Sequence, residues 1–265
     1  MSHNTIKDLS IQVDLNGLSF CILNRTEKQI EYLNTIAFET KLNPSEALDQ
    51  LKAELSTNTV FSDDFESVVI IHQNELSSLV PTSLYDEALN ADYLKFNTKI
   101  LQTDFISHDT LKTTESVNVY VPYVNINNYI FDTFGSFTYK HASTAFIDSV
   151  LALDTTKNTL YVNVSTNALA VVAVKDKRLE LYNRFEYHSK EDFIYYLLFV
   201  VEQLGWNPEI LDLKLSGQIY KDDDNYSICY KYIRNVSFTD KNLKYSLNKK
   251  LNGNPNANHI ILNSF

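Results

Sequence analysis

Glycine, cysteine and basic residues are all scarce in this chain of 265 residues. Only 5 glycines are present, which leaves little material for the loops that let a backbone approach a phosphate or a cofactor closely. The 2 cysteines, Cys21 and Cys229, each lie among apolar neighbours, so we expect buried reduced thiols rather than a disulfide. The Walker A, Gly-x-Ser-x-Gly and His-Glu-x-x-His patterns are also missing, and the enzyme classes that they mark are therefore not indicated.

The shortage of basic residues gives the chain a net charge of −10, because 33 acidic residues face 23 lysines and arginines. Binding to a nucleic-acid backbone depends on clustered lysine and arginine, so this balance argues against a nucleic-acid partner. An acidic surface of this kind commonly maintains solubility. The apolar fraction of 44% is that of an ordinary folded protein and excludes wholesale disorder.

Long apolar runs are missing as well. A membrane-spanning helix needs about 18 or more consecutive apolar residues, and no stretch of the chain reaches that length. The N-terminus does not carry a basic segment followed by an apolar one, which is the pattern of a secretory signal. We therefore expect a cytoplasmic protein that has no membrane partner.

The 6 histidines show no metal-ligand spacing, and no cysteine pairs with them. His72 and His141 each follow a strand-like run, and we expect both to have structural roles. The acidic run at residues 222–224 is interpreted as the solvated start of a helix rather than as a cation site. The sequence therefore predicts no metal site.

What the sequence does contain is a clear order of strand and helix patterns between residues 159 and 217. Three strand-like runs come first, at residues 160–164, 168–174 and 179–185. Ser189 then caps a strongly apolar helix that Gly205 ends, and residues 211–215 form one more strand. The order is β-β-β-α-β. The helix is so apolar that we expect it in the core, with its tyrosine hydroxyls at the rim.

The same order occurs earlier in the chain. Its strand-like runs lie at residues 11–15, 18–23, 30–38 and 67–72, with an irregularity near Asn34. A hairpin turn at Asn16-Gly17 joins the first two runs, and Asn43-Pro44 starts the helix. Placing Val13 over Val162 puts Asp14 on Asn163. A duplicated β-β-β-α-β-α unit is typical of the ribonuclease-H-like halves of the actin and sugar-kinase superfold, and the alternative is two unrelated α/β units.

The remaining segments complete two predicted lobes. Between the two copies, strands are expected at residues 76–81, 105–108, 117–122 and 137–141, and helices at residues 85–96, 125–134 and after a cap at Ser143. After the second copy, we expect a helix that follows residue 224, a strand at 236–238, a helical turn at Leu243 and Leu247, and a closing strand at 259–262. The predicted domains are residues 1–142, a lobe with an insertion, and residues 143–265.

Four segments of the chain resemble one protein family. They are residues 119–122 (Val-Tyr-Val-Pro), 125–129 (Asn-Ile-Asn-Asn-Tyr), 131–135 (Phe-Asp-Thr-Phe-Gly) and 230–235 (Tyr-Lys-Tyr-Ile-Arg-Asn). Through them the chain resembles an uncharacterised bacterial family, found mostly in Bacteroidetes, whose members are a domain of unknown function with an actin-like ATPase fold. The resemblance implies an α/β protein of two ribonuclease-H-like lobes. It implies no activity, because the family's function is not established.

The superfold also indicates where a nucleotide would bind. In its catalytic members the first hairpin of each lobe holds the phosphates, with an Asp that organises Mg²⁺ or water and a small residue or Gly beside it. The residues at these positions and at the adenosine side are Asp14, Asn16, Gly17, Ser165 and Gly217. In the first hairpin the Gly comes one residue later than in the usual Asp-x-Gly pattern. The second hairpin has neither an Asp nor a Gly. At the position where the superfold usually has a Gly-Gly pair, this chain has Ser216-Gly217. We expect Asp14 to bond locally to Asn16.

The predicted function is therefore that of a non-catalytic actin-like protein, a pseudo-ATPase that serves as a cytoplasmic scaffold or assembly partner for an unknown protein. No cofactor is predicted. The alternative is a divergent nucleotide-binding switch or ATPase that holds ATP and Mg²⁺ through the five residues above. A third function, nucleic-acid processing, would need a cluster of metal-binding carboxylates, and the hairpins offer only Asp14. The oligomeric state is left open.

Overall fold

The computed structural model describes residues 5–96, 98–239, 244–249, 251 and 255–265. These residues form two compact units. The first unit takes the described residues within Met1–Ala145, Leu243–Gly253 and Ile260–Phe265, and the second takes those within Phe146–Asn242 and Asn254–His259. Among the described residues, no helix is both long and apolar enough to cross a bilayer.

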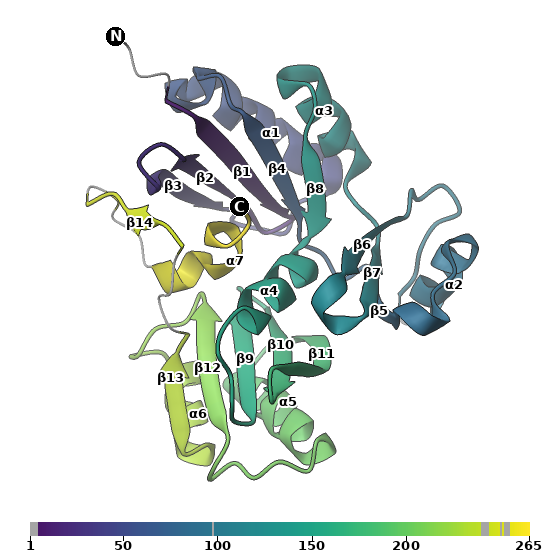
Figure 1. Cartoon of the computed structure of the whole chain (residues 1–265), viewed down its shortest axis with the longest axis vertical. Helices are drawn as coiled ribbons and strands as arrows, with labels where there is room; N and C mark the ends of the chain where they lie inside the picture. The colour runs from purple at the N-terminus through teal and green to yellow at the C-terminus, as the bar shows by residue number, and fades with distance from the viewer. Residues whose placement is uncertain (1–4, 97, 240–243, 250, 252–254) are drawn as a thin grey trace. The chain divides into compact units, whose positions relative to one another are not determined.

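The first unit is built on a six-stranded sheet in the order β14-β3-β2-β1-β4-β8 (Figure 1). Strands β1 to β3 are antiparallel neighbours, whereas β4 is parallel to β1 and β8 is parallel to β4. The helices α1 and α3 cover one face, where alternate residues of β1 such as Ile11 meet Leu51 and Ile126. The elements are β1 (Lys7–Asp14), β2 (Gly17–Asn24), β3 (Gln29–Ala37), α1 (Pro44–Thr57), β4 (Ser67–His72), α3 (Val124–Phe134) and β8 (Thr138–His141).

An insertion between β4 and α3 forms a three-stranded antiparallel sheet in the order β5-β7-β6, with α2 packed against it. Its strands are β5 (Ser77–Pro81), β6 (Ser107–Leu111) and β7 (Ser116–Tyr120). The strands β5 and β7 are close to the predicted ranges, whereas β6 begins two residues after the predicted start at 105 and extends to residue 111. The helix predicted at residues 85–96 is shorter: a 3₁₀ turn at Glu87–Leu89 leads into α2 (Asn90–Lys95). The other short 3₁₀ turns of the first unit are Thr59–Ser62, Thr82–Leu84 and Lys112–Thr114.

The C-terminal segment returns to the first unit and corrects two predictions. Residues 259–262, predicted as a strand, form the short helix α7 (His259–Leu262), after a 3₁₀ turn at Pro255–Asn258. Leu247, predicted in a helical turn, lies in β14 (Ser246–Leu247), which pairs in parallel with the start of β3; Leu243 lies outside the described residues. Ile261 and Leu262 pack on the face of the sheet opposite to α1.

The second unit contains a five-stranded sheet in the order β11-β10-β9-β12-β13. The helices α5 and α6 cover one of its faces, where Val162 and Leu215 meet Phe193 and Cys229. The elements are β9 (Thr159–Val164), β10 (Ala168–Lys175), β11 (Arg178–Glu186), α5 (Lys190–Gln203), β12 (Asp212–Gly217), α6 (Asp224–Tyr232) and β13 (Asn235–Phe238). The helix α4 (Ala142–Leu151) begins in the first unit and continues into the second from Phe146. The helix predicted to follow a cap at Ser143 begins at Ala142, so Ser143 lies in its first turn.

The two large sheets share one strand pattern. In each, two antiparallel pairings are followed by a parallel one, as β3-β2-β1-β4 and as β11-β10-β9-β12. The register shifts between Ile22 and Leu23 in one sheet and between Ala173 and Val174 in the other. One residue is extra at each shift, Glu31 in β3 and Glu180 in β11. The irregularity predicted near Asn34 therefore lies at Glu31.

Candidate functional site

The turn of the first hairpin lies one residue earlier than predicted. Asp14 pairs directly with Gly17, so the turn consists of Leu15 and Asn16, and Gly17 is the first residue of β2 rather than part of the turn. Asp14 Oδ1 accepts hydrogen bonds from the main-chain N of Asn16 at 2.7 Å and from its Nδ2 at 2.8 Å. The local bond expected between these two residues is present. The N–H that could face a phosphate is thereby used within the turn.

The second hairpin is held by main-chain and hydroxyl bonds instead. Ser165 donates to the carbonyl oxygen of Ala168 twice, from its main-chain N at 2.8 Å and from its Oγ at 3.0 Å. The carbonyl oxygen of Ser165 accepts from the hydroxyl of Tyr187 at 2.9 Å. The turn itself consists of Thr166 and Asn167, and the hairpin contains no carboxylate.

The registers of the two sheets correct the alignment that was made from the sequence. The carbonyl of Val13 accepts from Gln73 N at 2.9 Å, just beyond β4, and the carbonyl of Val164 accepts from Gln218 N at 2.7 Å, just beyond β12. Val13 therefore corresponds to Val164 and not to Val162. It follows that Asp14 corresponds to Ser165, which is a hydroxyl in place of a carboxylate.

Both candidate glycines are required by packing inside their own sheets. A Cβ on Gly217 would lie 2.1 Å from the carbonyl oxygen of Val164, and the residue has a φ of +86°. A Cβ on Gly17 would lie 2.5 Å from the carbonyl oxygen of Ile36. These contacts account for both glycines without a ligand.

The five candidate residues thus form two local sets. Asp14, Asn16 and Gly17 share one turn of the first unit, and Ser165 and Gly217 lie at neighbouring strand ends of the second. Each has a structural contact within its own unit. Within the part of the chain that the structure describes, no group of three or more His, Cys, Asp and Glu side chains is placed to hold a metal ion.

A buried polar network, which sequence reasoning did not find, connects the insertion to the start of α4. Asp109 Oδ1 accepts from the hydroxyl of Tyr120 at 3.0 Å, and its Oδ2 accepts from His141 N at 2.8 Å and Thr144 Oγ1 at 2.7 Å. Burial raises the pKa of Asp109. Ser143 Oγ lies 2.7 Å from His141 Nδ1, so Ser, His and Asp meet. Asp109 reaches the backbone of His141 and not its ring, which is not the geometry of a hydrolase triad.

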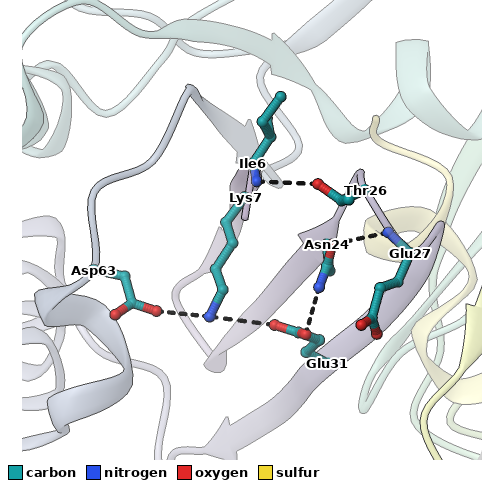
Figure 2. Close-up of polar contacts among 7 residues, drawn as sticks. All are labelled: Ile6, Lys7, Asn24, Thr26, Glu27, Glu31 and Asp63. Atoms are coloured by element: carbon teal, nitrogen blue, oxygen red, sulfur yellow. Dashed lines mark hydrogen bonds and ion pairs between the residues drawn. The ribbon is translucent and has the colours of Figure 1, made fainter. Parts of the chain in front are cut away.

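A second polar cluster, whose contacts are drawn in Figure 2, includes Lys7 at the start of β1, whereas the Asp14 turn follows the end of that strand. Lys7 Nζ lies 2.8 Å from Asp63 Oδ2 and 3.3 Å from Glu31 Oε2, and Asn24 Nδ2 donates to Glu31 Oε1 at 2.7 Å. The hydrogen bond to Asp63 raises the pKa of Lys7. Ligands of α/β sheets bind at the carboxyl ends of parallel strands, whereas Lys7 begins β1. The cluster fixes the extra residue Glu31 in place.

A groove of about 560 Å³ lies between α5 and α6 in the second unit. Its lining includes Ile194, Tyr195 and Leu198 from α5 and Ile228, Lys231 and Tyr232 from α6. The sequence predicted that α5 lies in the core with only its tyrosine hydroxyls at the rim, yet Tyr195 is 62% exposed and Phe199 is 40% exposed. A helix that is apolar on every face gives no sequence signal for which face remains open.

Several solved structures have the same fold. A protein of unknown function with an actin-like ATPase fold, from Bacteroides thetaiotaomicron VPI-5482, is 22% identical over 89% of this chain and 91% of its own, with a TM-score of 0.79. The PilM-PilN type IV pilus biogenesis complex matches at 12% identity over 97% of each chain, with a TM-score of 0.62. The ethanolamine utilization protein EutJ from Carboxydothermus hydrogenoformans matches at 6% identity over 97% of this chain and 88% of its own, with a TM-score of 0.51.

These likenesses and the strand order of the two sheets establish an actin-like ATPase fold. The fold implied by the sequence resemblance is therefore confirmed. No curated protein shows significant similarity to the chain. The model of the family described as protein of unknown function (DUF3822) matches residues 1–236, and the chain therefore belongs to that family.

Proposed function

We propose that this protein is a non-catalytic member of the actin-like ATPase fold, acting in the cytoplasm as a scaffold or assembly partner of another protein. One observation carries the proposal: where the first hairpin has Asp14, the second has Ser165, and Asp14 itself is bonded within its own turn. Phosphoryl transfer depends on a metal and on fixed charges that offset the transition state. The loss of one carboxylate removes several kcal/mol of that stabilisation, to order of magnitude.

A relative of the same fold supports a role in assembly. PilM is found in a complex with PilN in type IV pilus biogenesis. A partner held by surface contacts needs the folded scaffold but not the phosphate-binding hairpins. The structure is consistent with such a role, because both sheets of the fold are present and each candidate hairpin residue makes a structural contact within its own unit.

The proposal includes an internal duplication. Its predicted lobes are residues 1–142 and 143–265, and residues 260–265 at the end of the second lobe belong to the first compact unit. The same number of residues separates Val13 from Val164 and Ile22 from Ala173, which are the matched positions of register and bulge. Corresponding elements also have equal lengths: β2 and β10 have 8 residues, α1 and α5 have 14, and β4 and β12 have 6. Matched irregularities support duplication more strongly than matched strands, because a bulge has no reason to recur by chance.

Thermal unfolding with ATP or ADP, with and without Mg²⁺, tests the non-catalytic role. A ligand at about 100 times its Kd adds about 2.7 kcal/mol to stability, so binding would raise the melting temperature clearly. We expect no rise and no release of phosphate from ATP. A rise that needs Mg²⁺ and disappears in Asp14→Ala would contradict the proposal. It would establish the alternative, a nucleotide-binding switch that uses Asp14, Asn16, Gly17, Ser165 and Gly217.

A further inference from the structure

The groove between α5 and α6 has an apolar middle with aromatic side chains on both walls. Ile194, Leu198 and Ile228 form the apolar part of the lining. Tyr195 on one helix and Tyr232 on the other are 62% and 46% exposed. Exposed apolar and aromatic groups that gather beside a groove mark interaction sites, whereas single exposed ones do not.

The two ends of the groove carry opposite charge. At the start of both helices, Lys190 Nζ pairs with Asp224 Oδ2 at 3.1 Å, and the two charges cancel. The carboxylate of Glu191 remains, so this end of the groove has a net negative charge. Lys231, in the last turn of α6, makes the other end positive, and its Nζ lies 5.5 Å from the ring centroid of Tyr232. Among the described residues, neither Glu191 nor Lys231 forms an ion pair within 4.0 Å.

The length and walls of the groove favour one kind of occupant. Its lining runs from Lys190 to Leu198 along α5, roughly 12 Å at 1.5 Å per residue, which is about two helical turns. An extended peptide would leave its N–H and C=O groups beside side chains of two helices whose backbone groups are already paired. A helix pairs its own backbone groups and offers only side chains.

We infer that this groove binds an amphipathic α-helix of a partner protein. The apolar face of that helix enters between α5 and α6, a basic residue at one end meets Glu191, and an acidic residue at the other end meets Lys231. The inference rests on the proposed protein-binding role and assigns it a surface and a class of partner.

The probe is a fluorescein-labelled helical peptide with leucines at positions i, i+4 and i+7, a lysine at one end and a glutamate at the other. Its anisotropy is titrated with the full chain. We expect saturable binding that Tyr195→Ala weakens at least about tenfold, as for a central aromatic contact. The substitution Glu191→Lys should also weaken binding of this peptide. A second peptide, in which a glutamate replaces the lysine, should bind the Glu191→Lys variant with restored affinity.

The matched controls are Tyr230→Ala and Glu202→Lys, which change exposed residues of the same two helices outside the groove lining. Both should bind the peptide as the unchanged protein does, and circular dichroism verifies that all four variants are folded. The inference is wrong if the peptide does not bind saturably, or if the control variants lose as much peptide affinity as Tyr195→Ala does. Self-association that Tyr195→Ala abolishes would assign the groove to a second copy and would also overturn it.

The two proposals fail separately. If the chain binds neither the peptide nor a nucleotide, the inference that the groove binds a helix is refuted, and the proposed non-catalytic role is not affected. Stabilisation by ATP refutes the non-catalytic role, whatever the peptide does.

Discussion

The imidazole of His72 is fully buried at the end of β4, and burial lowers its pKa to about 4. Its Nδ1 accepts from the main-chain N of Tyr123 at 3.3 Å, so the ring proton lies on Nε2, which donates to Asn127 Oδ1 at 2.9 Å. Burial lowers the pKa of His259 to about 4 as well. The folded protein therefore holds both rings neutral, and the structural role predicted for His72 is confirmed by these bonds.

We predict that the free energy of unfolding falls as the pH is lowered from 7 to 5. The unfolded chain binds protons at these histidines from about pH 6.5 downward, but the folded chain does so only near pH 4, so acid favours the unfolded state. Each buried histidine contributes a loss of about 2 kcal/mol at pH 5. Urea unfolding at the two pH values measures it.

The variant His72→Gln should lose less stability between pH 7 and pH 5, since one titrating group is gone. His188→Gln, a change at an exposed histidine, serves as the control and should behave as the unchanged protein. Equal losses in all three proteins would mean that His72 does not carry the effect.

The helices α1 and α5 begin with the same device. Asn43 Oδ1 accepts from Glu46 N at 3.0 Å while Glu46 bonds back to Asn43 N at 2.9 Å, and Ser189 and Asp192 repeat this reciprocal pair. Both starts could be read from the sequence, because a cap depends on residues only three positions apart. Contacts between residues that are close in the sequence, such as helix caps, are the features that can be predicted most directly from a sequence.

Replacement of Ser189 by Ala should lower the free energy of unfolding by about 1 kcal/mol, because the main-chain N–H of Asp192 in the first turn of α5 loses its acceptor, Ser189 Oγ. Ser189→Asp keeps an acceptor and should stay close to the unchanged protein. Urea unfolding at constant pH compares the three. If Ala and Asp were equally destabilising, the capping role would be refuted.

The two wrong predictions about register and about residues 259–262 have physical causes. A shift of two residues along a strand keeps every side chain on its own face, so apolar alternation fits Val13 on Val162 as well as on Val164. The bonds to Gln73 and Gln218 and the positions of the two register shifts, which the sequence does not show, distinguish the two alignments. A histidine followed by three consecutive apolar residues, as in α7, fits a short strand and a helical turn equally.

Across the whole molecule, the first unit contains residues from both ends of the chain. Ile261, Leu262 and Phe265 pack with Cys21 and other residues of β2 and β3. Ser264 Oγ donates to Ser10 Oγ at 2.7 Å in the buried interior, and Lys140 Nζ donates to the carbonyl of Ser264 at 3.1 Å. The match to the family model ends at residue 236, before this segment begins.

Removal of residues 260–265 should therefore expose Cys21 while it leaves Cys229 covered. Cys21 loses the side chains of α7, whereas Cys229 lies in the core of the second unit between α6 and the sheet. Burial raises the pKa of both thiols, that of Cys229 to about 12, and both should react slowly in the full chain. Reaction with a thiol reagent, followed by peptide mass mapping, measures each site.

The second cysteine is the internal control for this truncation. Fast modification of Cys21 alone is the expected outcome. If both thiols reacted together, the whole chain would have lost its fold. If neither did, residues 260–265 would not be what covers that face.

Because α7 and β14 pack in the first unit, this unit cannot be completed until the end of the chain has been translated. On the ribosome, β1 is made early, yet the residues that cover its sheet on the side of Cys21 emerge only after β9 to β13 have been translated. The lobe that is synthesised first is thus the last to be finished. Until then a nascent chain displays the apolar side of β2 and β3, which is the surface that a ribosome-associated chaperone would bind.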